Sequence, residues 1–187
     1  MTENKESKLG GIVAGATGTL VVLLVGGIIY VYSGAYNITA TEEHSSVVRW
    51  AIDTTFRRSV ASGADGVRSP EELTPSMAAA GAAPYKQMCQ HCHAGSGVER
   101  ESWSEGMRPR PPHLVDAAAE WEPAEVFWLV KNGAKMTGMP AFGPTHSDED
   151  IWNIVAFVKQ LPAMAPEDYA SSGRAADSDA VSTPAQP

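Results

Sequence analysis

The chain contains very little cysteine: only Cys89 and Cys92 among 187 residues. A single close pair excludes a fold held together by several disulfides. The pair itself fits one tight disulfide or half of a metal site. Neither reading uses His93, which follows the second cysteine directly.

Basic residues are also scarce, with 14 Lys and Arg against 22 Asp and Glu and a net charge of −8. Nucleic-acid-binding proteins normally present a basic face, so this class is disfavoured and we expect no nucleic-acid partner. The acidic surface fits partners with basic docking patches, or simple solubility. Net charge influences both association and solubility, so it does not distinguish between these two interpretations.

Charge is absent between Lys8 and Glu42, and residues 9–32 within that gap are strongly apolar. A helix of this length spans about 36 Å, against about 30 Å for the hydrocarbon core of a bilayer. The segment therefore predicts a single transmembrane anchor. The alternative is a cleaved signal peptide, because residues 33–35 resemble a small-residue cleavage site, although the apolar run is about twice the usual signal core.

The charges beside the apolar segment predict its orientation. Residues 1–8 contain two lysines, whereas Glu42 and Glu43 follow the segment. The positive-inside rule then places residues 1–8 in the cytoplasm and the later residues on the outer side of the membrane, which in a bacterium is the periplasmic side of the inner membrane. Gly11 and Gly15 form a GxxxG step, which fits a transmembrane helix partner, although glycine is common in membrane helices in any case.

Residues 33–74 predict a juxtamembrane amphipathic helix followed by a linker. Over residues 44–62, apolar side chains recur every four positions, at Val48, Ile52, Phe56 and Val60. This helix fits the bilayer surface, a partner subunit or its own domain, and the sequence leaves the three open. Residues 171–187 contain almost no large apolar side chain, and we expect a disordered tail from 167 to 187.

The sequence Cys89-Gln90-His91-Cys92-His93 has the C-x-x-C-H spacing of a haem-attachment motif. Residues i and i+3 of a helical turn share a face, with side chains about 5–6 Å apart. Two thiols so placed can each add to one vinyl group of a haem, while the histidine at i+4 binds the iron. The motif predicts one covalently bound haem c held by Cys89, Cys92 and His93.

Two other uses of the cysteine pair fit less well. A zinc site needs two further ligands at suitable spacing, and no second C-x-x-C or H-x-x-H pair accompanies His113 and His146. A thioredoxin-like redox pair needs a strand before the motif, whereas the surrounding sequence predicts helix.

A second axial ligand to the iron is expected downstream of the motif. The candidates are His113, Met136, Met139 and His146. Met139 lies between Gly138, which allows close approach of the backbone to a flat cofactor, and Pro140, which stiffens the chain. We therefore predict Met139, with Met136 as the alternative. Ligation by His and Met raises the reduction potential, because a neutral thioether favours the reduced iron.

Residues 75–166 resemble class I cytochromes c, in particular small mono-haem bacterial proteins with a membrane anchor. The resemblance rests on CQHCH at 89–93, Gly81 and Tyr85 before it, TGMPAF at 137–142, and Ile154 and Phe157 in the last helix.

The resemblance implies an all-α fold wrapped around one haem. Its helices would cover about residues 75–89, 123–132 and 148–161. In this family a proline carbonyl accepts the Nδ1–H of the iron-binding histidine, which raises its donor strength. Pro112 is the expected residue here, with Pro111 as the alternative.

The resemblance further implies one-electron transfer rather than catalysis by the chain itself. The protein would be a membrane-anchored carrier, or the cytochrome subunit of a respiratory electron-transfer complex. Its partners would be membrane-bound or periplasmic redox proteins, a donor and an acceptor, in small transient contact near the haem edge. The alternative is a gas-binding sensor or enzyme subunit, in which Met139 leaves the iron.

Overall fold

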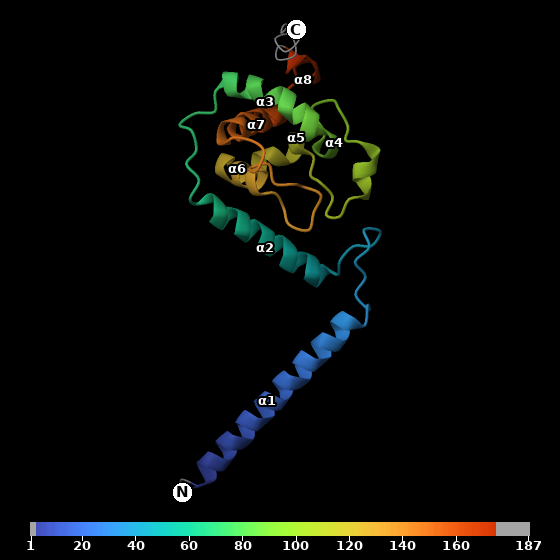
Figure 1. The fold of residues 1–187 in the computed structure, drawn as a ribbon, viewed down its shortest axis with the longest axis vertical. Coiled ribbons are helices and arrows are strands. Elements are labelled where there is room, and N and C mark those ends of the chain that lie inside the picture. Colours follow the sequence, from blue (N-terminus) through green and yellow to red (C-terminus); the bar gives the residue numbers. More distant parts are fainter. Residues whose placement is uncertain (1–2, 175–187) are drawn as a thin grey trace, which may run out of the picture. The chain divides into compact units, whose positions relative to one another are not determined.

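The computed structural model describes residues 3–174, and the regular elements in that range are helices, apart from an isolated bridge between Gly95 and Val98 (Figure 1). The predicted all-α class is confirmed. The chain divides into two units, Met1–Glu42 and Glu43–Pro187.

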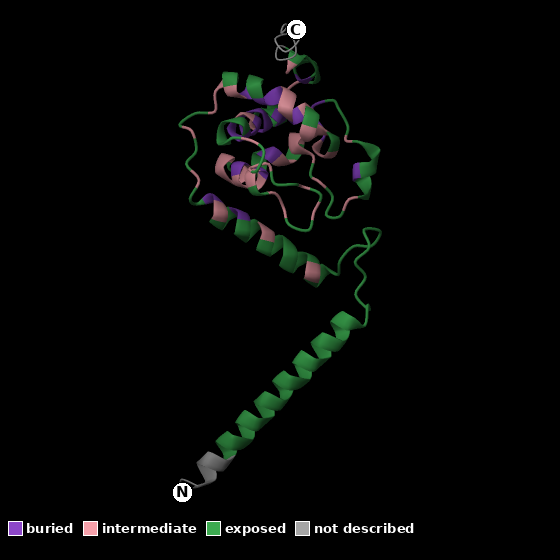
Figure 2. Ribbon diagram, viewed as in Figure 1, coloured by how far each residue is buried: buried purple, intermediate pink, exposed green. Residues whose placement is uncertain are grey.

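The first unit contains the helix α1, Glu3–Tyr32. Its segment Lys8–Tyr32 has a mean hydropathy of 2.3, and none of it is buried (Figure 2). A helix that is apolar all round normally lies in a protein core or in a membrane. By length and composition, α1 is suited to be a membrane anchor or a signal sequence.

The centre of the second unit is the crossing of α3, Pro75–Met88, with α7, Asp148–Gln160. Thr74 caps α3 by accepting a hydrogen bond from the backbone of Met77 at 3.3 Å. Ser147 and Asp150 form a reciprocal capping box at the start of α7. These helices agree with those expected from the sequence to within one residue.

Gly81 allows α3 and α7 to approach so closely. A Cβ at this position would overlap the carbonyl oxygen of Asn153 in α7. The crossing buries Tyr85 of α3 against Phe157 of α7, with ring centroids 5.3 Å apart. A first core cluster forms there, consisting of Ala82, Tyr85, Ala118, Ile154, Phe157, Val158, Leu161 and Tyr169.

The helix α6, Pro123–Asn132, packs on the other part of α7 and forms a second cluster. Phe127 of α6 stacks on Trp152 of α7 with centroids 4.3 Å apart. Short elements complete the unit: α4 (Gln90–His93), η1 (Ser102–Gly106), α5 (Leu114–Ala117), η2 (Ala118–Glu120) and η3 (Leu161–Ala163).

The helix α2, Ser46–Ala64, packs on its own domain, which was one of the three alternatives left open by the sequence. Val60 is only 1% exposed, and Phe56 lies edge-on to Trp121 with centroids 6.0 Å apart. A Cβ at Gly63 would overlap the indole of Trp128 in α6. The face of α2 near Val60 therefore belongs to the folded unit.

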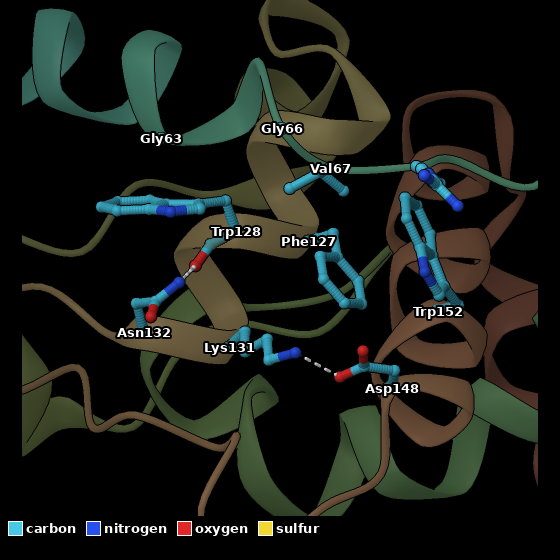
Figure 3. A pocket seen from close by; sticks show the side chains of 10 residues that line it. Gly63, Gly66, Val67, Phe127, Trp128, Lys131, Asn132, Asp148 and Trp152 are labelled. Carbon is cyan, nitrogen blue, oxygen red and sulfur yellow. Dashed lines mark hydrogen bonds and ion pairs between the residues drawn. The ribbon is translucent and has the colours of Figure 1, made fainter.

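A hollow of about 430 Å³ remains where the end of α2 meets α6 and α7 (Figure 3). Phe127 and Trp152 form one wall, and an ion pair of 2.6 Å between Lys131 and Asp148 lies beside it. None of the residues predicted to bind haem lines this hollow.

The sequence-based prediction of disorder from residue 167 is wrong at its start. Residues Pro166–Ser171 form the helix α8, and Tyr169 is 1% exposed. This one aromatic ring packs against Phe157, with centroids 6.0 Å apart, and so orders a segment whose composition is otherwise polar. Residues 175–187 of the predicted tail lie outside the described residues.

The crossing of α3 and α7 predicts the effect of Gly81→Ala. The added methyl group must displace the α7 backbone, so the free energy of unfolding should fall by about 1–3 kcal/mol. Chemical denaturation of the whole chain in detergent measures it. Gly66→Ala is the matched control, because a Cβ there meets nothing within 4 Å. Equal effects of the two substitutions would contradict the close crossing.

Candidate haem-binding site

The attachment motif continues α3 by one helical turn. The amide of Cys89 donates to the carbonyl of Tyr85 at 2.8 Å, and the amides of Cys92 and His93 donate to the carbonyl of Cys89 at 3.1 and 2.9 Å. Both cysteines are free thiols. The turn therefore presents two unpaired thiols and an imidazole within five residues: Cys89 at the N-cap of the short helix α4, and Cys92 and His93 at its end.

Burial raises the pKa of the Cys89 thiol to about 12, and the neighbouring Cys92 adds to this effect. Burial also raises the pKa of Cys92, although the charge of Arg100 opposes it. Both groups are therefore uncharged at neutral pH. A thioether is also uncharged, so a covalent linkage at these positions places no buried anion in the site.

His93 is oriented by a backbone carbonyl. Its Nδ1 lies 2.9 Å from the oxygen of Pro112, and because a carbonyl only accepts, Nδ1 carries the proton. The lone pair is then on Nε2, which is free to bind a metal. Burial lowers the pKa of His93, the Pro112 hydrogen bond raises it and Arg100 lowers it. The net direction is downward, which favours the neutral, ligating imidazole.

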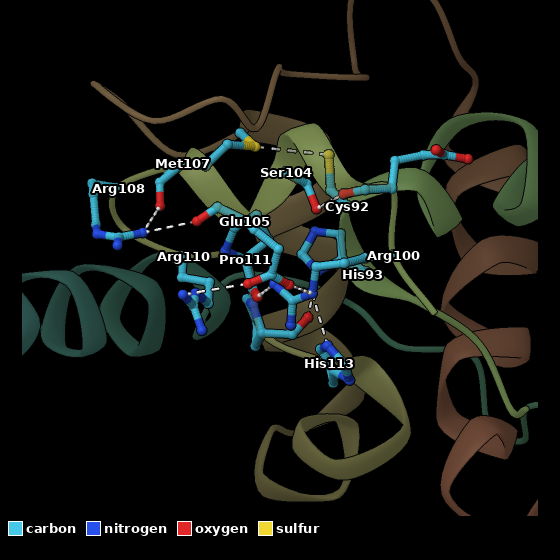
Figure 4. A network of polar contacts seen from close by, with 12 residues as sticks. Cys92, His93, Arg100, Ser104, Glu105, Met107, Arg108, Arg110, Pro111 and His113 are labelled. Carbon is cyan, nitrogen blue, oxygen red and sulfur yellow. Dashed lines mark hydrogen bonds and ion pairs between the residues drawn. The ribbon is translucent and has the colours of Figure 1, made fainter. Parts of the chain in front are cut away.

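Pro111, the alternative partner of His93, is engaged elsewhere. Its carbonyl accepts a hydrogen bond of 2.6 Å from Arg100, whose Nε donates to Nε2 of His113 at 2.7 Å (Figure 4). The Arg100 side chain is 6% exposed and lies 3.2 Å from the Glu105 carboxylate. Arg100 thus holds the loop that supplies the Pro112 carbonyl. The sequence carries no signal for this role, since it depends on tertiary contact alone.

The loop that carries Met139 is braced by its own hydrogen bonds. The hydroxyl of Thr137 donates to the carbonyl of Ala134 at 2.7 Å and accepts from the amide of Met139 at 3.1 Å. Gly133 begins the loop at φ +68°, where a Cβ would also lie only 2.7 Å from the amide nitrogen of Ala141. The loop is therefore a defined structure in which only glycine fits at position 133.

The two methionines of this loop differ sharply in environment. Met139 is partly buried and packs against the second core cluster, whereas Met136 is 94% exposed. His146, another candidate, is half-buried; its ring lies edge-on to Phe142, and its Nδ1 lies 2.9 Å from the Thr145 hydroxyl. Of these three side chains, the packing favours Met139 as a ligand.

Met107 links the attachment turn to the Met139 loop, and the sequence-based prediction did not find it. Its sulfur lies 4.0 Å from the Cys92 sulfur (Figure 4). Its methyl group packs so closely on Gly138 that a Cβ there would overlap it. The motif and the methionine loop, which are more than forty residues apart in the sequence, are thus brought together.

Residues 76–158 match the family model described as "Cytochrome C oxidase, cbb3-type, subunit III". This segment is a c-type cytochrome domain. The match includes the attachment motif and the Met139 loop, and it leaves α1, α2 and α8 outside. No curated protein matches the chain significantly.

The site residues of the cytochrome domain fit covalently bound haem. Two free thiols share a turn with a neutral imidazole. The lone pair of that imidazole lies on Nε2, because Nδ1–H is bonded to the carbonyl of Pro112. A thioether on a braced loop lies in the same region, since Met107 joins the two parts. This donor set suits haem iron, which an imidazole nitrogen and a thioether sulfur would hold.

The buried position of Arg100 predicts that Arg100→Met destabilises the cytochrome domain. The change leaves the Pro111 carbonyl and the His113 ring without their charged donor, and the free energy of unfolding should fall by about 2–3 kcal/mol. Denaturation followed by circular dichroism measures the loss. The control is Arg108→Met, because Arg108 is exposed and bonds only to carbonyls of its own segment, at Glu105 and Met107. A smaller loss at Arg100 than at Arg108 would contradict the role of Arg100.

Proposed function

We propose that the chain is a membrane-anchored electron-transfer protein with one haem c, attached through Cys89 and Cys92 and ligated by His93 and Met139. The observation that carries this proposal is the attachment turn, where two free thiols precede an imidazole whose Nδ1 is fixed by Pro112. The two cysteines are the only ones in the chain, which fits a single attachment motif.

Bound haem c supplies one-electron exchange between ferric and ferrous iron. The protein's own residues position it and tune it. Cys89 and Cys92 provide the covalent tether, and the Nε2 of His93 provides a strong nitrogen donor because Nδ1–H is bonded to a carbonyl. Met139 provides a neutral sulfur that favours the reduced state.

The surroundings of Met139 limit the access of water to the site. The methionine packs against the second core cluster, in which the rings of Phe127 and Trp152 are stacked on each other. A low-polarity environment disfavours the more highly charged oxidised iron and so raises the reduction potential. If His93 and Met139 both ligate the iron of a bound haem, no position remains open for substrate, which supports a role in electron transfer.

The role of α1 in this proposal is that of an uncleaved anchor. Its apolar segment of 25 residues is longer than the core of a usual signal peptide. Lysines precede it and Glu42 and Glu43 follow it, which supports a cytochrome domain on the periplasmic side of the membrane. Anchoring raises the effective concentration of the domain near membrane-bound partners.

The partners in this proposal are an electron donor and an electron acceptor, either membrane-bound or periplasmic. The matched family model is named after a subunit of a cbb3-type oxidase. A role as the cytochrome subunit of an electron-transfer complex therefore fits, as does that of an anchored carrier.

The two methionines of the loop provide a matched test of ligation. Met139→Leu should abolish the weak long-wavelength charge-transfer band of the oxidised protein, lower its reduction potential and let the reduced protein bind carbon monoxide. Met136→Leu should leave all three unchanged, because Met136 is solvent-exposed. Absorption spectra and a redox titration measure these properties.

Two outcomes would contradict this assignment. Loss of the band in Met136→Leu rather than in Met139→Leu would make Met136 the ligand. Rapid binding of carbon monoxide by the reduced wild-type protein would show an open iron position and favour a gas-binding function instead.

A further inference from the structure

The helix α8 lies outside the segment matched by the family model, yet its aromatic side chain reaches the attachment turn. Tyr169 of α8 is 1% exposed, and its hydroxyl donates to the side-chain oxygen of Gln90 at 2.6 Å. Gln90 is the residue directly after Cys89. The Tyr169 ring also lies so close to Gly95 that a Cβ there would overlap it. One side chain therefore contacts residues at both ends of the turn.

Lys86 ties α8 to α3 just before the motif. Its ammonium donates to the carbonyls of Tyr169 and Ser172, at 2.6 Å each, and lies 4.8 Å from the centroid of the Tyr169 ring. A further bond is formed after the motif, where the Ser96 hydroxyl donates to the carbonyl of Met164 at 2.6 Å. The C-terminal segment thus accepts hydrogen bonds from both sides of the motif: from Lys86, three residues before Cys89, and from Ser96, three residues after His93.

The attachment turn needs such support from outside. The helix α4 has only four residues, and a helix this short is not stable by itself. It ends at Ala94, which has φ 64° and ψ −168°, a backbone conformation that costs a non-glycine residue about 1–3 kcal/mol. A strained end of this kind persists only where neighbouring contacts hold it. The Tyr85 hydroxyl supplies one, to the carbonyl of Ala94 at 2.8 Å.

We propose that residues 164–172 form a C-terminal clamp that fixes the haem-attachment turn, with Tyr169 and Lys86 as positioning residues for Cys89 and His93. The clamp deepens the proposed function, because it concerns the turn to which the haem is bound in that proposal. It acts by holding the backbone from Gln90 to Gly95, and thereby the direction in which the His93 ring points.

The test compares two lysines that make nearly the same bonds. Lys86 donates to two carbonyls of the clamp, whereas Lys159 donates to the carbonyls of Ala118 and Trp121 at 2.7 Å each. The full chain in detergent is studied as wild type, Lys86→Met, Tyr169→Phe and Lys159→Met. Amide hydrogen exchange at residues 90–95 reports the rigidity of the turn, and proton NMR of the haem methyl groups reports the orientation of the axial ligands.

Lys86→Met and Tyr169→Phe should each speed exchange of the His93 and Ala94 amides by about tenfold. They should also change the pattern of haem methyl shifts in the oxidised protein. Lys159→Met should lower the unfolding midpoint while leaving both properties of the turn as in the wild type. Gln90→Leu should reproduce the effect of Tyr169→Phe, and the double variant should add nothing, because both remove the same hydrogen bond.

Unchanged exchange at residues 90–95 in Lys86→Met and Tyr169→Phe would overturn the clamp, and so would an equal change in Lys159→Met. Failure of the proposed function has a different signature, because wild-type protein would then show no haem methyl signals at all. Amide exchange would still test the clamp in that case, since it does not require the haem.

Discussion

The site depends on the hydrogen bond between Nδ1 of His93 and the carbonyl of Pro112, at 2.9 Å. This bond places the proton on Nδ1, leaves the lone pair on Nε2 and fixes the plane of the ring. Other contacts hold the two groups that form this bond, the Pro112 carbonyl and the His93 ring. Arg100 fixes the neighbouring Pro111 carbonyl on one side, while the helical turn that starts at Cys89 fixes the His93 backbone on the other. Without either support, the imidazole would have no defined direction.

The rest of the cytochrome domain acts as a frame for this bond. The close crossing of α3 and α7 at Gly81 fixes the end of α3, and therefore the start of the attachment turn. The second core cluster, which contains the stacked rings of Phe127 and Trp152, supports Met139 near the other part of α7. The two halves of the site are thus carried by two helix pairs that share α7: α3 with α7 for the attachment turn, and α6 with α7 for Met139. Met107 lies between the two halves and contacts both.

Local sequence signals predicted the parts of the fold that depend on local physics. The helices expected over about residues 75–89, 123–132 and 148–161 are present, and the capping residues Thr74 and Ser147 and the prolines that begin α3 and α6 explain where they start. The attachment motif is likewise a local pattern, since its spacing is that of a helical turn. Arg100, Met107 and Tyr169 were missed because their roles arise from contacts between distant segments. The packing of α2 remained open for the same reason: its apolar stripe fits several surfaces equally well.

Covalent attachment is the claim on which the whole account rests, and the mass of the native chain tests it most directly. Protein isolated from its host membranes, denatured in acid and freed of unbound cofactor, should retain the mass of one haem. After digestion, that mass should lie on the peptide that contains Cys89 and Cys92. A colourless chain with the mass of its amino acids alone, or a haem that is removed by acid, would contradict the account.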